Sequence, residues 1–441
     1  MIFVHKQVEN RQHSVDDGTV FPRNALASIQ QALTDTPVVL VQGPRQTGKT
    51  TLVRGMCQNT QGRTFLSLDD ALTASAAGTD PTAFLASHDG PIAIDEVQHV
   101  PELFRAIKVL VDRNRTPGRF LLTGSANALL LPRLSESLAG RMEIRTLGPL
   151  SQGELSSTVE SFIDDVFDDR AMAVLLRKDA TGEDHAMSPS LTERMLRGGF
   201  PEPTQRADAD RRRAWFESYL STVLMRDLRA LADIEGLTEL PRLLAMLATR
   251  VSGLLNFADL SRSLSMPQTT LKRYMALLEA TFLVLRLPAW SNNRGVRLTK
   301  APKLFLCDTG LTSFLLGADR KRLDHDGSVR GAMLECFVAM ELLKQREWSH
   351  LRPVLHHFRT VSGQEVDLVL EDASGRVVGI EVKATHSIKT DDFRGLRALS
   401  AICGERMVRG IVLHGGAQSA AFGPNLVALP IPSLWQSKRI G

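Results

Sequence analysis

The sequence has few cysteines and no long hydrophobic run. Its 441 residues include four cysteines that form no Cys-x-x-Cys pair: Cys57, Cys307, Cys336 and Cys403. This scatter argues against a disulfide framework or a zinc site and is typical of reduced thiols in the cytoplasm. No stretch of about 18 apolar residues is present, and the first residues lack the apolar core of a signal peptide. We therefore expect a cytoplasmic protein with no signal peptide and no contact with a membrane.

A large excess of charge of either sign is also missing. The chain carries 53 basic and 49 acidic side chains, which gives a formal net charge of +4. That value does not by itself indicate a nucleic-acid partner, which would need a local basic patch. A hydrophobic content of 43% is ordinary for a globular protein, and the length suggests roughly three domains.

What the sequence does contain is a phosphate-binding pattern. Residues Gly43–Thr50 read Gly-Pro-Arg-Gln-Thr-Gly-Lys-Thr, which fits G-x-x-x-x-G-K-[ST]. The apolar run Pro37–Gln42 before it predicts a strand, and Thr51–Met56 after it predicts the start of a helix. Glycines allow the backbone to approach phosphates, and backbone N–H groups at the helix N-terminus attract them. We expect Lys49 to contact the β- and γ-phosphates and the Thr50 hydroxyl to bind Mg²⁺. The full predicted nucleotide contact set is Gly43, Pro44, Arg45, Gln46, Thr47, Gly48, Lys49, Thr50 and Thr51.

Two acids follow at the end of another predicted strand, Pro91–Glu96. Asp95 and Glu96 come about 45 residues after the phosphate loop, the usual place for its acidic partner. Ligands collect at the carboxyl ends of parallel strands, so we expect Asp95 to hold the Mg²⁺. Glu96 would polarise the water that attacks the γ-phosphate. The alternative is a pair of acids at an exposed strand end.

Candidate sensors of the γ-phosphate lie on the next predicted strand and beyond it. One of Thr123, Ser125 or Asn127 could contact the phosphate or orient the water, although a plain polar turn explains them nearly as well. Arg141 could sense the phosphate in cis or from a neighbouring subunit, and a surface arginine is an equal alternative.

Residues 151–236 are rich in Leu, Ala and charge and predict a helical lid on the ATPase. Residues 237–300 predict three helices with a tight turn and then a strand, which resembles a winged helix-turn-helix. The residues of its third helix that would face DNA are Gln268, Thr269, Lys272 and Arg273. The alternative is a module packed between domains, with a polar face that is merely solvated.

Residues 301–441 contain a predicted antiparallel hairpin, Glu365–Leu370 and Val377–Lys383. A turn centred near Ser374 places Asp367 opposite Glu381, with Lys383 on the same face. Facing carboxylates repel unless they share a cation, and oxygen ligands suit Mg²⁺ or Mn²⁺.

With Glu335 on the preceding helix, the residues Asp367, Glu381 and Lys383 resemble the PD-(D/E)XK nuclease fold, also called restriction-endonuclease-like. The sequence departs from that pattern because Val366 stands where a proline is usual. The alternative is an inert descendant of the fold, with a surface salt bridge between Glu381 and Lys383.

Five motifs in order resemble a large family of prokaryotic ATPases of the AAA+ superfamily. They are the phosphate loop, Asp-Glu-Val-Gln at 95–98, Leu-Thr-Gly-Ser at 122–125, Leu-Ala-Gly-Arg at 138–141 and Gly-Gly-Phe-Pro-Glu at 198–202. The resemblance implies ATP as the nucleotide, and the absence of an Asn-Lys-x-Asp motif agrees. It also implies a C-terminal region that is often nuclease-like.

The expected fold class is therefore α/β, built around a P-loop NTPase parallel sheet. We expect a polar lead (1–20), an ATPase core (21–150), a helical lid (151–236), a winged helix (237–300) and a nuclease-like domain (301–441). The leading hypothesis is a Mg²⁺-dependent ATPase that acts on DNA. The rival is an ATP-dependent switch or scaffold for a protein partner, and a homo-oligomer fits either.

Overall fold

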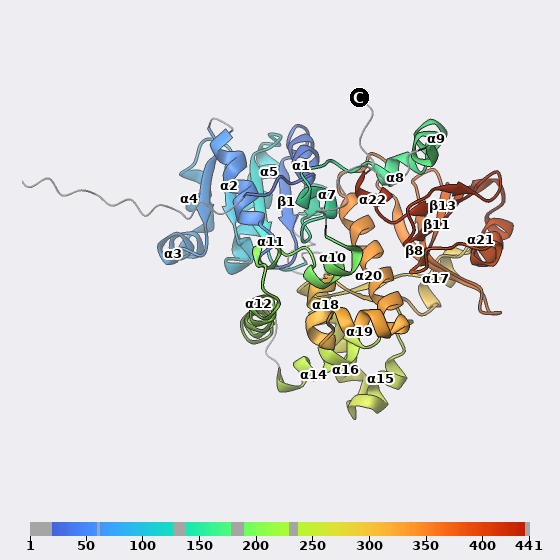
Figure 1. Ribbon diagram of the computed structural model, residues 1–441. Coiled ribbons are helices and arrows are strands. Elements are labelled where there is room, and N and C mark those ends of the chain that lie inside the picture. The colour runs from blue at the N-terminus through green and yellow to red at the C-terminus, as the bar shows by residue number, and fades with distance from the viewer. Residues whose placement is uncertain (1–19, 60–61, 128–137, 178–188, 229–236, 437–441) are drawn as a thin grey trace, which may run out of the picture.

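A computed structural model describes residues 20–59, 62–127, 138–177, 189–228 and 237–436. Nearly all of the polar lead predicted for residues 1–20 lies outside these ranges. Three parts of the molecule can be followed in Figure 1: a blue and cyan sheet, a green and yellow group of helices beside it, and an orange and red sheet. None of the described helices is long and apolar enough to cross a membrane.

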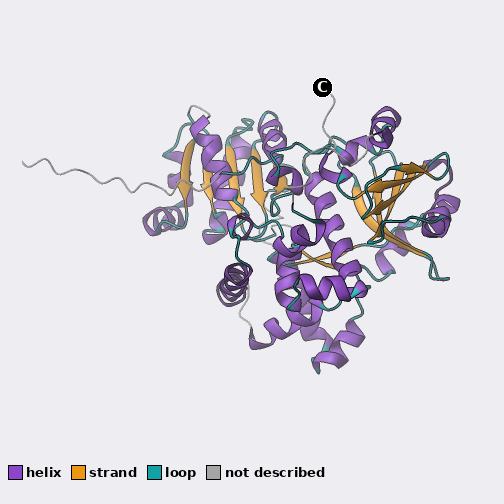
Figure 2. Cartoon of the chain, viewed as in Figure 1, coloured by secondary structure: helices purple, strands orange, loops and turns teal. Residues whose placement is uncertain are grey.

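The first sheet has five strands, all parallel, in the order β2-β3-β4-β1-β5. The strands are β1 (Val38–Gln42), β2 (Thr64–Ser67), β3 (Ile92–Asp95), β4 (Phe120–Gly124) and β5 (Met142–Thr146). Alternate residues of the buried strands face opposite layers of helices, as the pleat requires. The helices of this part are α1 (Ala25–Leu33), α2 (Lys49–Asn59), α3 (Ala71–Thr79), α4 (Pro81–Ala86), η1 (Val97–His99) and α5 (Glu102–Arg113). The predicted parallel sheet is confirmed, and Figure 2 shows helices on both of its faces.

The helical group contains the three helices predicted from the sequence, and a hairpin follows them. The three helices are α14 (Leu240–Ala248), α15 (Phe257–Leu264) and α16 (Gln268–Ala280), and the 3₁₀ turn η4 (Leu237–Glu239) leads into α14. Strand β6 (Val284–Leu287) pairs antiparallel with β7 (Lys303–Leu306), and α17 (Arg294–Thr299) lies between them in the chain. The predicted boundary at residue 300 therefore cuts through a hairpin, because β7 pairs with β6 and not with the last sheet.

The last sheet has six strands of mixed direction in the order β12-β13-β11-β10-β9-β8. Its strands are β8 (Val354–Arg359), β9 (Glu365–Glu371), β10 (Val377–Lys383), β11 (Met407–His414), β12 (Ala420–Ala421) and β13 (Leu426–Pro430). One face packs on α20 (Gly327–Gln345) and the other on α21 (Arg394–Cys403). The remaining helices here are α18 (Thr309–Leu316), α19 (Arg320–His325), η5 (Thr390–Phe393), η6 (Gly404–Arg406) and α22 (Ser433–Gln436).

The predicted helical lid is divided between two parts of the molecule. Helices α8 (Phe162–Asp165) and α9 (Asp169–Arg177) pack into the core of the last sheet, and in Figure 1 they lie beside its red strands. Helices α11 (Pro201–Gln205) and α12 (Ala209–Thr222) and the π-helical turn η3 (Val223–Asp227) continue into the helical group. The apolar face of a short helix does not specify which core it joins, so the sequence alone could not show this division. Two further short helices are α7 (Gln152–Leu155) and α10 (Leu191–Arg197), while residues 178–188 and 229–236 of the predicted lid lie outside the described ranges.

Candidate functional site

The phosphate loop joins the end of β1 to the start of α2. Gly43 has φ +151°, and a Cβ on it would collide with the backbone carbonyl of Leu147, so glycine is required there. The Lys49 ammonium is buried and donates to the carbonyl oxygens of Gly43 at 3.0 Å and Pro44 at 2.8 Å. The loop thus curls around the lysine, whose ammonium is held by two of the loop carbonyls.

The predicted Mg²⁺ ligands lie together at this loop. The Thr50 hydroxyl donates to both oxygens of the Asp95 carboxylate, at 3.0 and 2.9 Å. The Thr123 hydroxyl donates to Asp95 Oδ1 at 2.5 Å. Burial raises the pKa of Asp95, and the two hydroxyl donors oppose that rise. A hydroxyl and a carboxylate side by side at the loop form a donor set that fits Mg²⁺.

Glu96 is fixed beside Asp95 in a left-handed backbone conformation with φ +56°. Its N–H donates to the Thr123 hydroxyl at 2.9 Å, and the Ser125 hydroxyl donates to its Oε1 at 3.0 Å. Gln98 donates to its other oxygen. Burial alone would raise the pKa of Glu96, but the Lys49 ammonium and these hydrogen bonds lower it below its ordinary value. Glu96 is therefore an ionised carboxylate at neutral pH and can accept a proton.

The four predicted sensor residues have different positions. Thr123 and Ser125 contact the two acids, whereas the N–H of Asn127 donates to the carbonyl of Ala280 at the end of α16, at 2.7 Å. Arg141 precedes β5, and the pairing of Val38 with Met142 places it at the amino end of the sheet, one strand length (about 15 Å) from the phosphate loop. There it bonds Asp112 and the carbonyl of Ala139. The cis role predicted for Arg141 is therefore wrong, and a role toward a neighbouring subunit stays a prediction.

Sequence reasoning missed Arg206 and Arg211, which lie close to the loop. A pocket of about 360 Å³ lies between the loop tip and helices α11 and α12, and its lining includes Arg45, Gln46, Arg206, Arg211, Trp215 and Tyr219. The last two rings are stacked on each other, with centroids 5.1 Å apart and planes 6° apart. Glu202 also lines the pocket and pairs with Arg206, so the three guanidinium groups leave a net positive charge beside the phosphate loop, which suits an anion. The run Arg211-Arg212-Arg213 was the available signal in the sequence.

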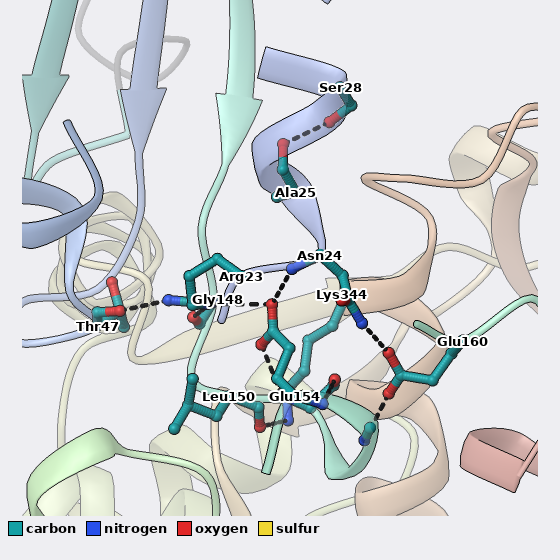
Figure 3. Close-up of polar contacts among 12 residues, drawn as sticks. Arg23, Asn24, Ala25, Ser28, Thr47, Gly148, Leu150, Glu154, Glu160 and Lys344 are labelled. Carbon is teal, nitrogen blue, oxygen red and sulfur yellow. Dashed lines mark hydrogen bonds and ion pairs between the residues drawn. The ribbon is translucent and has the colours of Figure 1, made fainter. Parts of the chain in front are cut away.

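Another missed residue, Arg23, ties the phosphate loop to the segment after β5 (Figure 3). Its guanidinium donates to the carbonyls of Thr47 at 2.6 Å and Gly148 at 2.8 Å, and to Glu154 Oε1 at 3.0 Å. Glu154 also accepts from the N–H of Asn24 at 2.8 Å. Both members of the Arg23–Glu154 pair are buried, with side chains 8% and 1% exposed.

The same segment contacts helix α20 of the last sheet. Lys344 donates to the Leu150 carbonyl at 2.9 Å and to Glu341 at 2.8 Å, and Glu341 accepts from the N–H of Gln152 at 2.8 Å. Nearby, Glu160 accepts from the N–H of Gly153 at 2.7 Å. Burial, with Glu341 close by, raises the pKa of Glu160 to about 8. The phosphate loop and α20 are therefore joined through one buried polar network.

The hairpin β9–β10 has the predicted register. Leu368 pairs with Ile380 and Val377 with Glu371, so the next positions along the strands are Asp367 and Glu381. The Asp367 carboxylate accepts from the N–H of Val382 at 2.9 Å.

Glu335, Asp367 and Glu381 are brought together as predicted, but the cluster contains a cation that the sequence analysis did not identify. The Lys303 ammonium contacts Glu335 at 2.7 Å, Glu365 at 2.8 Å and Asp367 at 3.0 Å. Lys383 pairs with Glu381 at 2.7 Å. Within the described ranges, no group of three or more His, Cys, Asp or Glu side chains is arranged to hold a metal ion.

The residues predicted to face DNA lie on the exposed side of α16. Gln268, Thr269, Lys272 and Arg273 are all exposed, while Leu271, Met275 and Leu278 are buried. The Lys272 ammonium lies 5.9 Å from the centre of the Phe257 ring.

Comparison with known proteins divides the chain into three matched regions. Residues 35–156 match the AAA domain. Residues 188–322 match a domain of unknown function (DUF8612), and residues 330–434 match another (DUF4143).

Two mycobacterial proteins are similar over most of the chain. Uncharacterized protein Rv2008c of Mycobacterium tuberculosis and uncharacterized protein Mb2031c of Mycobacterium bovis are each 34% identical over 411 residues, which cover 92% of this chain and 83% of theirs. Among solved structures, the Walker-type ATPase PABY2304 of Pyrococcus abyssi is 13% identical with a TM-score of 0.38, covering 67% of this chain and 96% of its own. The RuvB Holliday junction branch migration motor of Thermotoga maritima is 19% identical with a TM-score of 0.28, covering 60% and 89%.

Proposed function

The chain belongs to the family of these two mycobacterial proteins and contains an AAA domain, and on that premise we propose that it is a Mg²⁺-dependent ATPase. One observation carries the proposal. Asp95 and Glu96 are buried together beside the phosphate loop, and the Thr123 hydroxyl bonds both of them. Two neighbouring acids beside a phosphate loop can divide the work, with Asp95 as a metal ligand and Glu96 as a base.

The loop residues bind and orient the nucleotide in this proposal. Lys49 exchanges its bonds to the loop carbonyls for the β- and γ-phosphate oxygens, while Thr50 and Asp95 hold Mg²⁺. When bound, Mg²⁺ neutralises negative charge that develops on the phosphates. Glu96 orients a water and takes its proton, and Ser125 and Gln98 hold the carboxylate in place for that step.

The polar face of α16 supports DNA as the substrate on which the ATPase acts. Two cations and two amide or hydroxyl side chains share one exposed helical surface, as in proteins that contact phosphates and base edges. The rival function, a nucleotide-driven switch or scaffold for a protein partner, is favoured by the Lys303 ammonium within the C-terminal carboxylates. ATP turnover measured with and without duplex DNA separates the two, because DNA should stimulate turnover only under the first.

Two variants test the ATPase itself. Lys49→Ala removes the cation that faces the phosphates and should abolish tight ATP binding in a calorimetric titration. Glu96→Gln keeps the shape of the side chain but cannot accept a proton, so it should bind ATP normally and hydrolyse it roughly 10²–10⁴-fold more slowly. Arg54→Ala, an exposed change on α2, is the matched control and should leave both quantities unchanged. Equal loss of ATP binding in both test variants would contradict the separate roles.

A further inference from the structure

The carboxylate cluster of the last sheet already has a cation at its centre. The Lys303 side chain is 2% exposed, and its ammonium lies 2.7–3.0 Å from oxygens of Glu335, Glu365 and Asp367. Those distances are normal for an ammonium and longer than the 2.0–2.6 Å that Mg²⁺ or Ca²⁺ requires. The oxygens are therefore spaced for a nitrogen cation.

The charges around the cluster account for the position of this lysine. Four acids meet here, and two of them have other partners at the edge: Lys383 contacts Glu381 at 2.7 Å and Arg359 contacts Glu365 at 3.3 Å. Without Lys303, two negative charges in a largely buried site would have no compensating cation. A divalent ion would match that deficit, but it cannot enter beside an ammonium that already contacts the same oxygens.

The lysine does not come from the domain that supplies the acids. It begins β7, which pairs with β6 in the hairpin that follows α16, and α16 in turn accepts the bond from Asn127 of the ATPase. Vacating the cluster therefore requires the hairpin to move away from the last sheet, because a lysine this deeply buried cannot swing out alone.

We propose that Lys303 is the resident cation of this cluster, so that the C-terminal domain binds no divalent metal there while the hairpin β6–β7 is in place. The predicted metal-dependent nuclease activity is then absent from the protein in this conformation. The acids instead fasten the helical group to the last sheet. This inference lies beyond the proposed ATPase and does not depend on it.

Titration of the nucleotide-free, full-length protein with MnCl₂ tests the proposal, with bound Mn²⁺ measured by electron paramagnetic resonance. Any Mn²⁺ bound by the wild type should be lost in Asp95→Asn and unaffected by Asp367→Asn. Lys303→Met should gain one Mn²⁺ that survives Asp95→Asn and is lost with Asp367→Asn. At 100-fold excess over Kd, that Mn²⁺ should raise the Tm of the variant by roughly 5–10 °C.

Lys383→Met is the matched control, because it removes the other lysine of the cluster and leaves Lys303 in place; it should gain no Mn²⁺. Wild-type Mn²⁺ binding that disappears in Asp367→Asn would overturn the proposal, as would a folded Lys303→Met that gains none. If Lys303→Met does not fold, Glu335→Gln and Asp367→Asn are added to remove the two charges that are left without a cation. This triple variant must then recover the fold, and its failure to do so would also refute the counter-cation role.

Discussion

Replacing Arg23 by alanine should destabilise the ATPase far more than the loss of one surface arginine would. The guanidinium makes three hydrogen bonds, two of them to carbonyls that flank the nucleotide site, at Thr47 and Gly148. Its ion pair with Glu154 is buried on both sides. Removing one partner of such a pair leaves an uncompensated charge in the interior.

The magnitude follows from these contacts. Breaking a buried pair costs about 3–5 kcal/mol, and Glu154 keeps only backbone donors after the change. For a domain the size of this ATPase, each kcal/mol lost from the free energy of unfolding lowers the Tm by about 2–4 °C, so a fall of roughly 6–20 °C is expected. The affinity for ATP should also fall, by about tenfold if the Thr47 segment keeps its binding geometry one-tenth of the time.

Differential scanning fluorimetry and an ATP titration measure the two effects on the same samples. Arg54→Ala is the control, because this exposed guanidinium only lies over the Phe65 ring, a contact worth about 0.5–1 kcal/mol. Arg23→Lys keeps the charge but cannot reach three acceptors, so it should recover part of the loss. A Tm for Arg23→Ala no lower than that of Arg54→Ala would refute the reasoning.

Two further predictions concern pH and salt. The pKa of Glu160 is raised to about 8, so between about pH 4 and pH 8 the folded state holds a proton that the unfolded chain has released. The stability contributed by this group must therefore fall as pH rises. In denaturant melts at pH 5 to 8, the free energy of unfolding of Glu160→Gln relative to the wild type should increase by up to about 1.4 kcal/mol per pH unit. A difference that stays constant with pH would count against this prediction. Lys272→Ala with Arg273→Ala should weaken DNA binding and reduce its salt slope by about one unit per lost phosphate contact, as measured by fluorescence anisotropy. If DNA binds and the slope is unchanged, the DNA surface lies elsewhere.

Features determined by neighbouring residues in the chain could be predicted from the sequence. The strand, loop and helix around Gly43 and Lys49 follow from glycine spacing and apolar runs. The pairing of Leu368 with Ile380 follows from a short turn and the two-residue period of a strand. In both cases the interacting groups are close in sequence, so few alternatives compete.

Contacts between distant segments could not be predicted in this way. Lys303 lies 32 residues before Glu335 and 64 before Asp367, and in sequence it is only a polar residue at the start of an apolar strand. A usable signal was its position in a strand with no exposed face, since a lysine buried there needs acids around it. Predicting the position of Arg141 would have required the direction of strand β5. Predicting the positions of α8 and α9 would have required knowing which core they join.

The packing of α8 and α9 also affects how the chain folds during synthesis. Phe162, Val166 and Met172 belong to the core that contains Leu429 and Trp435, which are made much later. At about 5–20 residues per second, the ribosome needs roughly 15–50 s to deliver the strands that cover them. Through that interval the amino-terminal ATPase can fold while the apolar faces of α8 and α9, which are attached to it, remain without their partner sheet. Such a nascent chain exposes the apolar faces of α8 and α9 midway along its length until the strands that cover them have been made.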